Sequence, residues 1–204
     1  MISRRALVFG LPLAAAGACS APQTSSPPAM IASKRFAGLG PRVLTLYTMR
    51  SVSTGSGAHS SLLIDAPSQR VIFDPAGSFR HSTIAERNDV LFGVTPEVEA
   101  YYVSYHARET YYVIGQTVQV SDAVAEQALD LALTNGPVAQ SFCTNSTARL
   151  LRQLPGFSSL PQTFFPNTLA NRFRKLPGVT SREWRENDPD NKALALAEIE
   201  MQLR

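Results

Sequence analysis

Three side chains in this sequence, Cys143, His59 and Asp74, are of the types that together form a nucleophilic site. Cys143 lies in Ser141-Phe142-Cys143-Thr144-Asn145-Ser146, directly before an apolar helical pattern. The thiolate is the reactive form of cysteine, and a helix N-terminus lowers the thiol pKa because unpaired backbone N–H groups and the helix dipole stabilise negative charge. This position predicts a nucleophilic thiol if a base lies beside it.

The base expected for such a thiol is a histidine, because a Cys–His pair activates the sulfur as an ion pair or by proton removal. The sequence offers His59, His81 and His106. His59 follows Gly55-Ser56-Gly57-Ala58 and opens an apolar run, which leaves room on one side and fixes the residue on a core strand. His81 and His106 are predicted on loops, as surface or hydrogen-bonded residues. His59 is therefore the predicted base.

A third group is expected to hold the imidazole in the right tautomer. Asp74 closes the strand pattern Val71-Ile72-Phe73, which a short turn joins to the His59 strand. The two side chains are thus expected on neighbouring strands. A strand-ending turn residue before proline is the other interpretation of Asp74, and Asp65 is interpreted as a hairpin residue.

Cysteine usage leaves two interpretations of Cys143. Exported domains normally use cysteines in pairs as disulfides, and the second cysteine, Cys19, belongs to the leader described next. A leftover thiol in an exported protein is either buried and inert, as free cysteine often is, or reactive.

The N-terminus has the layout of a bacterial export signal. Arg4 and Arg5 precede an apolar run over 6–16, and small residues lead to Cys19. Residues 1–18 resemble a lipoprotein signal peptide, in which cleavage precedes the cysteine and Cys19 is the lipid attachment site. Ala16 stands where leucine is more usual, and Ser3-Arg4-Arg5 is similar to a twin-arginine signal.

This leader predicts how the protein meets a membrane. The apolar run is shorter than the ~20 residues that a spanning helix needs. We therefore expect attachment through the N-terminal lipid, in the bacterial cell envelope, with the folded part facing the periplasm or the exterior.

Residues 19–35 and 36–204 differ in composition. The first segment is rich in Ser, Pro, Ala and Thr and is predicted to be a flexible tether. Residues 36–204 have the length of one domain. The formal net charge of +3 falls to +1 when Arg4 and Arg5 leave with the signal peptide, so the charge predicts no nucleic-acid partner.

The elements expected to position the site are strands followed by helices. Apolar alternation predicts strands over 43–49, 59–64, 70–73, 100–103, 110–114 and 117–120, with a turn at 66–69 and an irregular stretch over 75–95. Helical spacing predicts helices over 122–134, 144–154, 166–176 and 191–203, so that Cys143 begins the second helix. A solvated face is expected for Arg172, Arg174, Arg182 and Arg185. The fold class predicted is α+β, an antiparallel sheet packed against helices.

The order of these patterns resembles a known family. A histidine begins a core strand in Gly-Ala-His59-Ser-Ser-Leu-Leu-Ile, a polar residue ends the next strand in Val-Ile-Phe-Asp74-Pro-Ala, and a later helix opens with Phe-Cys143-Thr-Asn. This is similar to circularly permuted papain-like domains, in which the histidine precedes the cysteine. The group includes permuted NlpC-type peptidases and amidases and the lecithin:retinol acyltransferase-like enzymes. The resemblance covers about residues 43–154, and Phe142 replaces the asparagine that often precedes the nucleophile.

The resemblance implies a papain-like domain over 36–204, with a C-terminal helical extension, and a thiol hydrolase or acyltransferase activity. His59 would deprotonate Cys143, the thiolate would attack an amide or ester carbonyl, and Asp74 would orient the imidazole, with neither a metal nor an organic cofactor. Location and family analogy favour a peptidoglycan amide as substrate, with acyl lipids as a second class. The tyrosine-rich segment 101–112 and Phe164-Phe165 are interpreted as a hydrophobic groove or as core. The alternative is an envelope lipoprotein that uses the same scaffold for binding, without turnover.

Overall fold

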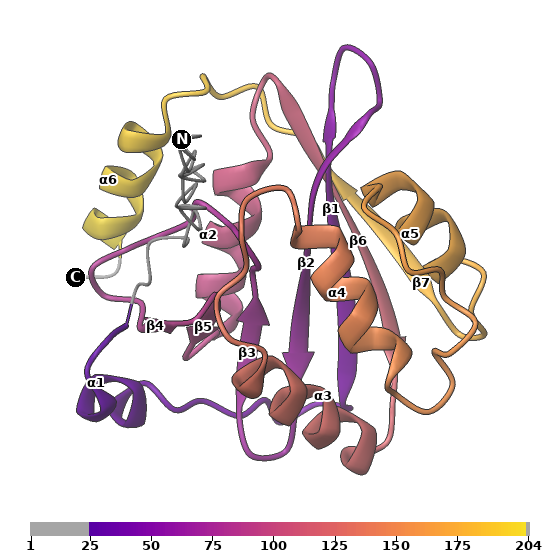
Figure 1. Ribbon diagram of the computed structural model, residues 1–204. Helices are drawn as coiled ribbons and strands as arrows, with labels where there is room; N and C mark the ends of the chain where they lie inside the picture. The colour runs from indigo at the N-terminus through magenta and orange to yellow at the C-terminus, as the bar shows by residue number, and fades with distance from the viewer. Residues whose placement is uncertain (1–24, 203–204) are drawn as a thin grey trace, which may run out of the picture.

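The computed structural model describes residues 25–202 and has an α+β architecture (Figure 1). Within that range, seven strands form one sheet in the order β4-β5-β3-β2-β1-β6-β7, and each neighbouring pair is antiparallel. The strands are β1 (Val43–Ser51), β2 (Gly57–Asp65), β3 (Arg70–Phe73), β4 (Glu86–Arg87), β5 (Val90–Phe92), β6 (Tyr111–Gln119) and β7 (Thr180–Trp184). The predicted fold class is confirmed at this level.

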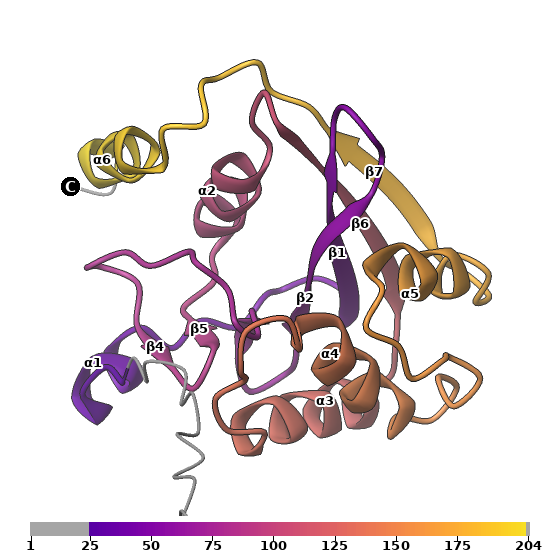
Figure 2. The same ribbon diagram turned by 45° about the horizontal axis from the view of Figure 1, so that its top comes forward.

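Helices cover both faces of the sheet. Figure 2 shows α3, α4 and α5 on one side of the central strands and α2 and α6 on the other. The helices in the described residues are α1 (Pro28–Ser33), α2 (Pro96–His106), α3 (Asp122–Thr134), α4 (Cys143–Arg152), α5 (Pro166–Phe173) and α6 (Lys192–Gln202).

The period-two alternation of β2 decides which face each side chain joins. Leu62 and Ile64 belong to the core cluster under α3, α4 and α5, whereas Leu63 belongs to the cluster under α2 and α6. By the same alternation Ser60 lies on the α4 face, and His59 and Ser61 lie on the α2 face. The strand therefore offers functional groups to helices on both sides.

The segment 100–103, predicted as a strand, is part of helix α2, so that prediction is wrong. Its start carries a helix signal: the Thr95 hydroxyl accepts a hydrogen bond from the Val98 N–H, and Pro96 occupies the first turn. The aromatic residues favour strands by propensity, but here the capping and the burial of one helix face outweigh that preference.

Two predicted strands, 110–114 and 117–120, form the single strand β6. The glycine between them does not break the strand: a Cβ on Gly115 would lie 2.7 Å from the Trp184 ring. Glycine is needed there for the close approach of Trp184, which ends β7. Strand β7 was not predicted, because it is an edge strand with mostly exposed side chains. It carries Arg182, one of the arginines expected on a solvated face, and this side chain is exposed.

The irregular stretch 75–95 contains the hairpin β4–β5. Asn88 and Asp89 both have positive φ, 49° and 64°, which is the conformation of the tight turns that join hairpin strands. The strands are only two and three residues long, too short for a period-two pattern to reveal them.

The predicted tether overlaps ordered structure. Residues 28–33 form α1, whose Met30 and Ile31 pack against the core, and Ser25 forms an isolated β-bridge with Arg87. The predicted signal peptide, 1–18, and Cys19 lie outside the described residues. Among the helices of residues 25–202, none has both the length and the apolar character to cross a bilayer.

Helix α4 carries Cys143, and its packing against the sheet holds the thiol in place. This packing predicts that two leucine-to-alanine substitutions differ in their effect on stability. Leu151→Ala on α4 is expected to lower the free energy of unfolding by about 3 kcal/mol, because it leaves a cavity in the core. Leu151 is fully buried, whereas Leu194 on α6 is 52% exposed. Leu194→Ala is expected to change the free energy by less than about 0.5 kcal/mol. Urea unfolding followed by circular dichroism measures both, and equal losses would contradict the buried position of Leu151.

Candidate active site

Cys143 is the first residue of α4, and its thiol is buried and not in a disulfide. The first turn of α4 is tied to the sheet, because the Thr144 hydroxyl lies 3.1 Å from that of Ser60 on β2. The chain enters the helix through Ser141, which has a positive φ of 71°. A left-handed conformation is uncommon for serine, and such backbone strain concentrates at functional sites.

His59 lies between Cys143 and Asp74. Its Nε2 is 2.6 Å from Asp74 Oδ1, and its ring lies close enough to the Cys143 thiol for each group to shift the pKa of the other. Because Nε2 is engaged by the carboxylate, Nδ1 is the ring nitrogen left for the sulfur. The structure therefore brings together the three side chains that the sequence analysis selected, in the order thiol, imidazole, carboxylate.

Sheet register explains how Asp74 reaches His59. Strands β2 and β3 pair with Leu62 opposite Phe73, so Asp74 leaves β3 beside the first half of β2. The β1–β2 register shifts between Met49 and Arg50, opposite the start of β2. Such bulges re-aim side chains next to active sites.

A tight turn closes over the Asp74 carboxylate. The Gly77 N–H donates to the Asp74 carbonyl at 2.9 Å, and a Cβ on Gly77 would lie 1.8 Å from Asp74 Oδ2. Only glycine fits this position. The turn thus seals one carboxylate oxygen and leaves Oδ1 for hydrogen bonds.

Tyr102 on α2 is a second partner of Asp74 and was missed by the sequence analysis. Its hydroxyl lies 2.8 Å from Asp74 Oδ1 and 2.7 Å from Ser61 Oγ. The carboxylate only accepts, so the phenol donates to Asp74 and accepts from Ser61. Because the sequence pattern predicts a strand over 100–103, it gives no reason to place Tyr102 beside Asp74. The helix signal at Thr95-Pro96 places Tyr102 seven residues along α2.

The electrostatics favour an ion pair between Cys143 and His59. Burial by itself lowers the pKa of His59, but Asp74, and then Cys143, outweigh it and raise the pKa to about 10. Burial by itself raises the pKa of Cys143, but the hydrogen bond and charge of His59, with the Ser60 N–H, lower it to about 7. Burial also raises the pKa of Asp74, and the charge of His59 reverses this and lowers it. Above about pH 7 the pair is therefore a thiolate and an imidazolium.

His106 was predicted on a loop, as a surface or hydrogen-bonded residue; the loop placement is wrong, and the residue is hydrogen-bonded. It is the last residue of α2, it is buried, and its ring lies parallel to that of His59 with centroids 6.2 Å apart. Burial lowers its pKa to about 3. The ring is thus neutral, and since Nδ1 lies 2.8 Å from the Tyr102 carbonyl, Nδ1 carries the hydrogen and Nε2 is a free acceptor.

The remaining candidates lie apart from this site. His81 hydrogen-bonds within its own loop, where Nδ1 is 2.9 Å from the Thr83 hydroxyl. Asp65 ends β2 at the opposite end from His59 and pairs with Arg70 and Arg42. Neither residue contributes to the thiol site.

Asp89 connects the two loops that frame the site. Its carboxylate accepts from the N–H of Val138, at 2.7 Å, and from that of Ala76. Its own carbonyl accepts from the Asp74 N–H at 2.7 Å. The turn after Asp74 and the loop before Cys143 are therefore held together by one buried side chain.

A cleft of about 350 Å³ opens at the thiol and imidazole. Both loops and both helical layers contribute to it, and its lining residues are Met49, Ala58, His59, Ala76, Gly77, Ser78, His106, Tyr111, Gln140, Ser141, Cys143 and Lys192. A reactive thiol at the wall of a cleft can reach a substrate, whereas an inert core thiol cannot.

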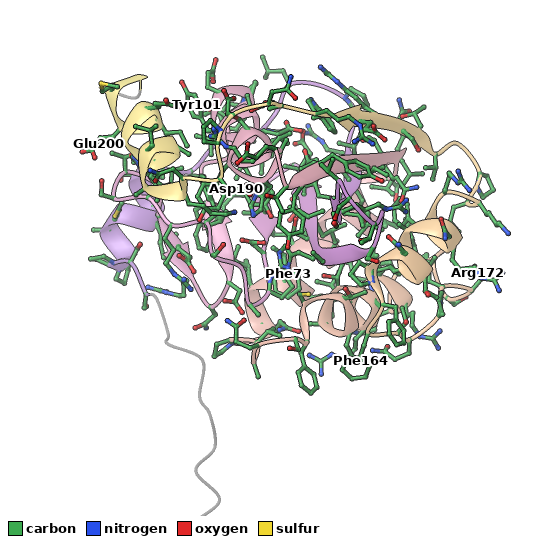
Figure 3. All side chains as sticks on the ribbon, turned by 90° about the horizontal axis from the view of Figure 1, so that it is seen from above. Phe73, Tyr101, Phe164, Arg172, Asp190 and Glu200 are labelled. Atoms are coloured by element: carbon green, nitrogen blue, oxygen red, sulfur yellow. The ribbon has the colours of Figure 1, made fainter. Side chains whose placement is uncertain are left out.

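The aromatic residues divide between core and surface. Tyr102 and Tyr105 lie on the buried face of α2, and Tyr111 lines the cleft. Phe164 and Phe165 are 51% and 70% exposed. Phe164 lies at the periphery in Figure 3 and contacts Phe142 edge to face, with centroids 5.2 Å apart. These phenylalanines do not line the cleft but form an exposed aromatic patch with Phe142, the residue that precedes Cys143.

No family model, curated protein or solved structure matches this chain. The assignment of function therefore rests on the geometry of the site. Within residues 25–202, no three His, Cys, Asp or Glu side chains are grouped to hold a metal ion.

The lowered pKa of Cys143 predicts its pH profile. Alkylation by iodoacetamide is expected to rise with pH around a midpoint near 7 rather than the ~8.5 of free cysteine, because the thiolate is the reacting form. In His59→Ala the stabilising charge is lost while burial remains. The midpoint should then move above ~8.5, and the rate at pH 7 should fall by more than about tenfold. His81→Ala is the control and should keep the wild-type profile. A midpoint that does not depend on His59 would mean an inert thiol.

The Tyr102 hydrogen bond predicts a smaller effect. Tyr102→Phe keeps the ring packing but removes one donor to Asp74, so the imidazolium should be less well stabilised. We expect the alkylation rate at pH 7 to fall roughly fivefold, the equivalent of one hydrogen bond, with the midpoint moving to higher pH. Tyr101→Phe changes the neighbouring residue, whose hydroxyl does not contact Asp74, and should leave the rate unchanged. Equal rates in the two variants would remove Tyr102 from the site.

Proposed function

We propose that this protein is a cysteine hydrolase that cleaves an amide or ester bond, with Cys143 as nucleophile, His59 as base and Asp74 as the orienting group. The observation that carries the proposal is the adjacency of Cys143, His59 and Asp74 at the wall of a cleft, with His59 hydrogen-bonded to the buried carboxylate. A structural cysteine has no need of a charged partner that is itself fixed by a buried carboxylate.

The chemistry follows from this arrangement. His59 accepts the thiol proton, and the thiolate attacks the substrate carbonyl carbon. The backbone N–H of Cys143 lies in the first turn of α4, where it has no intrahelical acceptor, and it is available to the developing oxyanion. The imidazolium then protonates the leaving amine or alcohol, and a thioester forms on Cys143. Water, activated by His59, hydrolyses the thioester and restores the thiol.

We further propose that the domain has the permuted papain-like arrangement. The support is the order along the chain: a histidine near the start of a central antiparallel strand, a carboxylate at the end of the next strand and a nucleophile at the start of a later helix. The helix packs on the strand that carries the histidine. This juxtaposition of helix and sheet is the one that a thiol–imidazole pair requires.

The location and substrate are proposed from the leader. A lipid on Cys19 would hold the enzyme at a membrane of the bacterial cell envelope, where the peptide amides of peptidoglycan are the first substrate class. Transfer of the acyl group to an acceptor other than water is a second candidate. The exposed Phe142–Phe164 pair next to the nucleophile favours it, because it offers apolar surface to an acyl chain.

Product analysis tests the proposal. The purified protein is incubated with peptidoglycan fragments and, separately, with acyl lipids, and products are identified by mass spectrometry. Cys143→Ala is expected to abolish turnover, and Asp74→Asn to lower it by at least about 100-fold, because the imidazole loses its charged partner and its correct tautomer. New amines and carboxylates indicate hydrolysis, and acylated acceptors indicate transfer. If Cys143→Ala and Asp74→Asn form products at the wild-type rate, or if the wild-type protein itself turns over no substrate, the non-catalytic binding alternative is favoured.

A further inference from the structure

The cleft beside Cys143 is lined by cationic and neutral groups, and no carboxylate is among its lining residues. Lys192, the first residue of α6, lies on the cleft wall with His59 and His106. Cys143, His59 and Asp74 come from α4, β2 and the end of β3, not from α6. Lys192 is therefore an addition to the thiol site and has no part in the bond-making steps above.

The ammonium of Lys192 is held in place by Tyr105. Its Nζ lies 4.0 Å from the centroid of the Tyr105 ring and 3.5 Å from the Tyr105 carbonyl oxygen. Tyr105 is itself buried and fixed, because its hydroxyl donates to the Ser78 carbonyl at 3.1 Å. A lysine on a free surface would sample many rotamers, whereas this one has a fixed position at the cleft wall.

The charged groups around Lys192 are compatible with binding of an anion. No ion pair joins its ammonium to a carboxylate within residues 25–202. Two carboxylates act on the ammonium without forming an ion pair with it: Asp190, on the segment that leads into α6 (Figure 3), and Asp74, which is engaged by His59. The buried Arg108 adds a second positive charge in the neighbourhood.

We propose that Lys192 binds a carboxylate of the substrate, so that the enzyme acts on acyl compounds that carry a negative charge near the scissile carbonyl. This inference rests on the proposed function, because it names the substrate class of the same site. A partly buried ammonium that has no carboxylate at ion-pair distance gains from a direct partner, and a carboxylate of the substrate supplies one. Lysine suits this role as a compact point charge with three donors. Acidic peptides fit this description, whereas uncharged esters do not.

The test uses two reagents that alkylate Cys143 and differ in charge: iodoacetate, which carries a carboxylate, and neutral iodoacetamide. The ratio of their rates is measured at pH 7.5 and low ionic strength with the full chain. Lys192→Met keeps the length and apolar stem of the side chain and removes its charge. We expect the iodoacetate-to-iodoacetamide ratio to fall roughly fivefold, since one attractive charge at the cleft is lost. Lys192→Arg should keep the ratio, and added salt should reduce the wild-type ratio toward that of Lys192→Met.

The ratio separates charge recognition from folding and from nucleophile activation, because a change in fold or in thiol pKa affects both reagents. Lys175→Met removes the same charge from an exposed position after α5 and should leave the ratio unchanged. An unchanged ratio in Lys192→Met, or an equal fall in Lys175→Met, overturns the inference but leaves the nucleophile intact. Slow alkylation by both reagents, independent of His59, overturns the proposed nucleophile and this inference with it.

Discussion

The structure depends on one charged hydrogen bond, between His59 Nε2 and Asp74 Oδ1, placed where water is largely excluded. Removing two charges from water is unfavourable unless each finds compensating partners. Asp74 has Tyr102 as a second donor, and Ser61 supports that phenol in turn. Glycine at position 77 allows the turn to close over the remaining oxygen. The Tyr102 donor, the Ser61 hydroxyl and the glycine at position 77 are thus all explained by the need to stabilise the buried charged pair.

The sheet is the frame that makes this arrangement possible. Alternation along β2 directs His59 and Ser61 toward α2 and Ser60 toward α4, so that one strand contacts the supports of both the carboxylate and the thiol. Asp89 links the loop after Asp74 to the loop before Cys143 across the end of the sheet. A displacement of either loop would disrupt the site, because the sulfur, the imidazole and the carboxylate come from different elements.

The neighbouring histidines show how environment divides one residue type into two chemical states. His59 faces a carboxylate, which raises its pKa to about 10, whereas burial lowers the pKa of His106 to about 3. The two rings lie parallel at 6.2 Å, and two imidazolium ions at that distance would repel each other. A neutral His106 therefore forms part of the conditions under which His59 can be charged. Because the ring is neutral and Nδ1 carries the hydrogen, its Nε2 is an acceptor.

The catalytic candidates were predictable from the sequence because each lies at the boundary of an element with a strong local signal. Cys143 precedes a regular helical pattern that stops at Pro155-Gly156, and His59 and Asp74 border two short apolar strands. The residues that support them were harder to predict from the sequence. Tyr102 and His106 lie on α2, where aromatic residues suggested a strand, and the capping signal at Thr95-Pro96 was the better guide. Asp89 acts through its position in a two-residue turn whose strands are too short to give a periodic signal.

Lys192 illustrates the limit of local patterns. It lies in a segment whose apolar spacing fits an ordinary amphipathic helix. Nothing in the sequence connects residue 192 with Cys143, 49 positions earlier. The connection arises only because α6 packs against α2, with Ala195 and Ile199 in the core cluster beneath it. That packing returns the end of the chain to the cleft. Under the proposals above, Cys143, His59 and Asp74 set the chemistry, while Lys192 on a C-terminal helix contributes a charge that selects the substrate. The same proposal implies that substitutions in α6 change specificity without disturbing the charged pair on which the site depends.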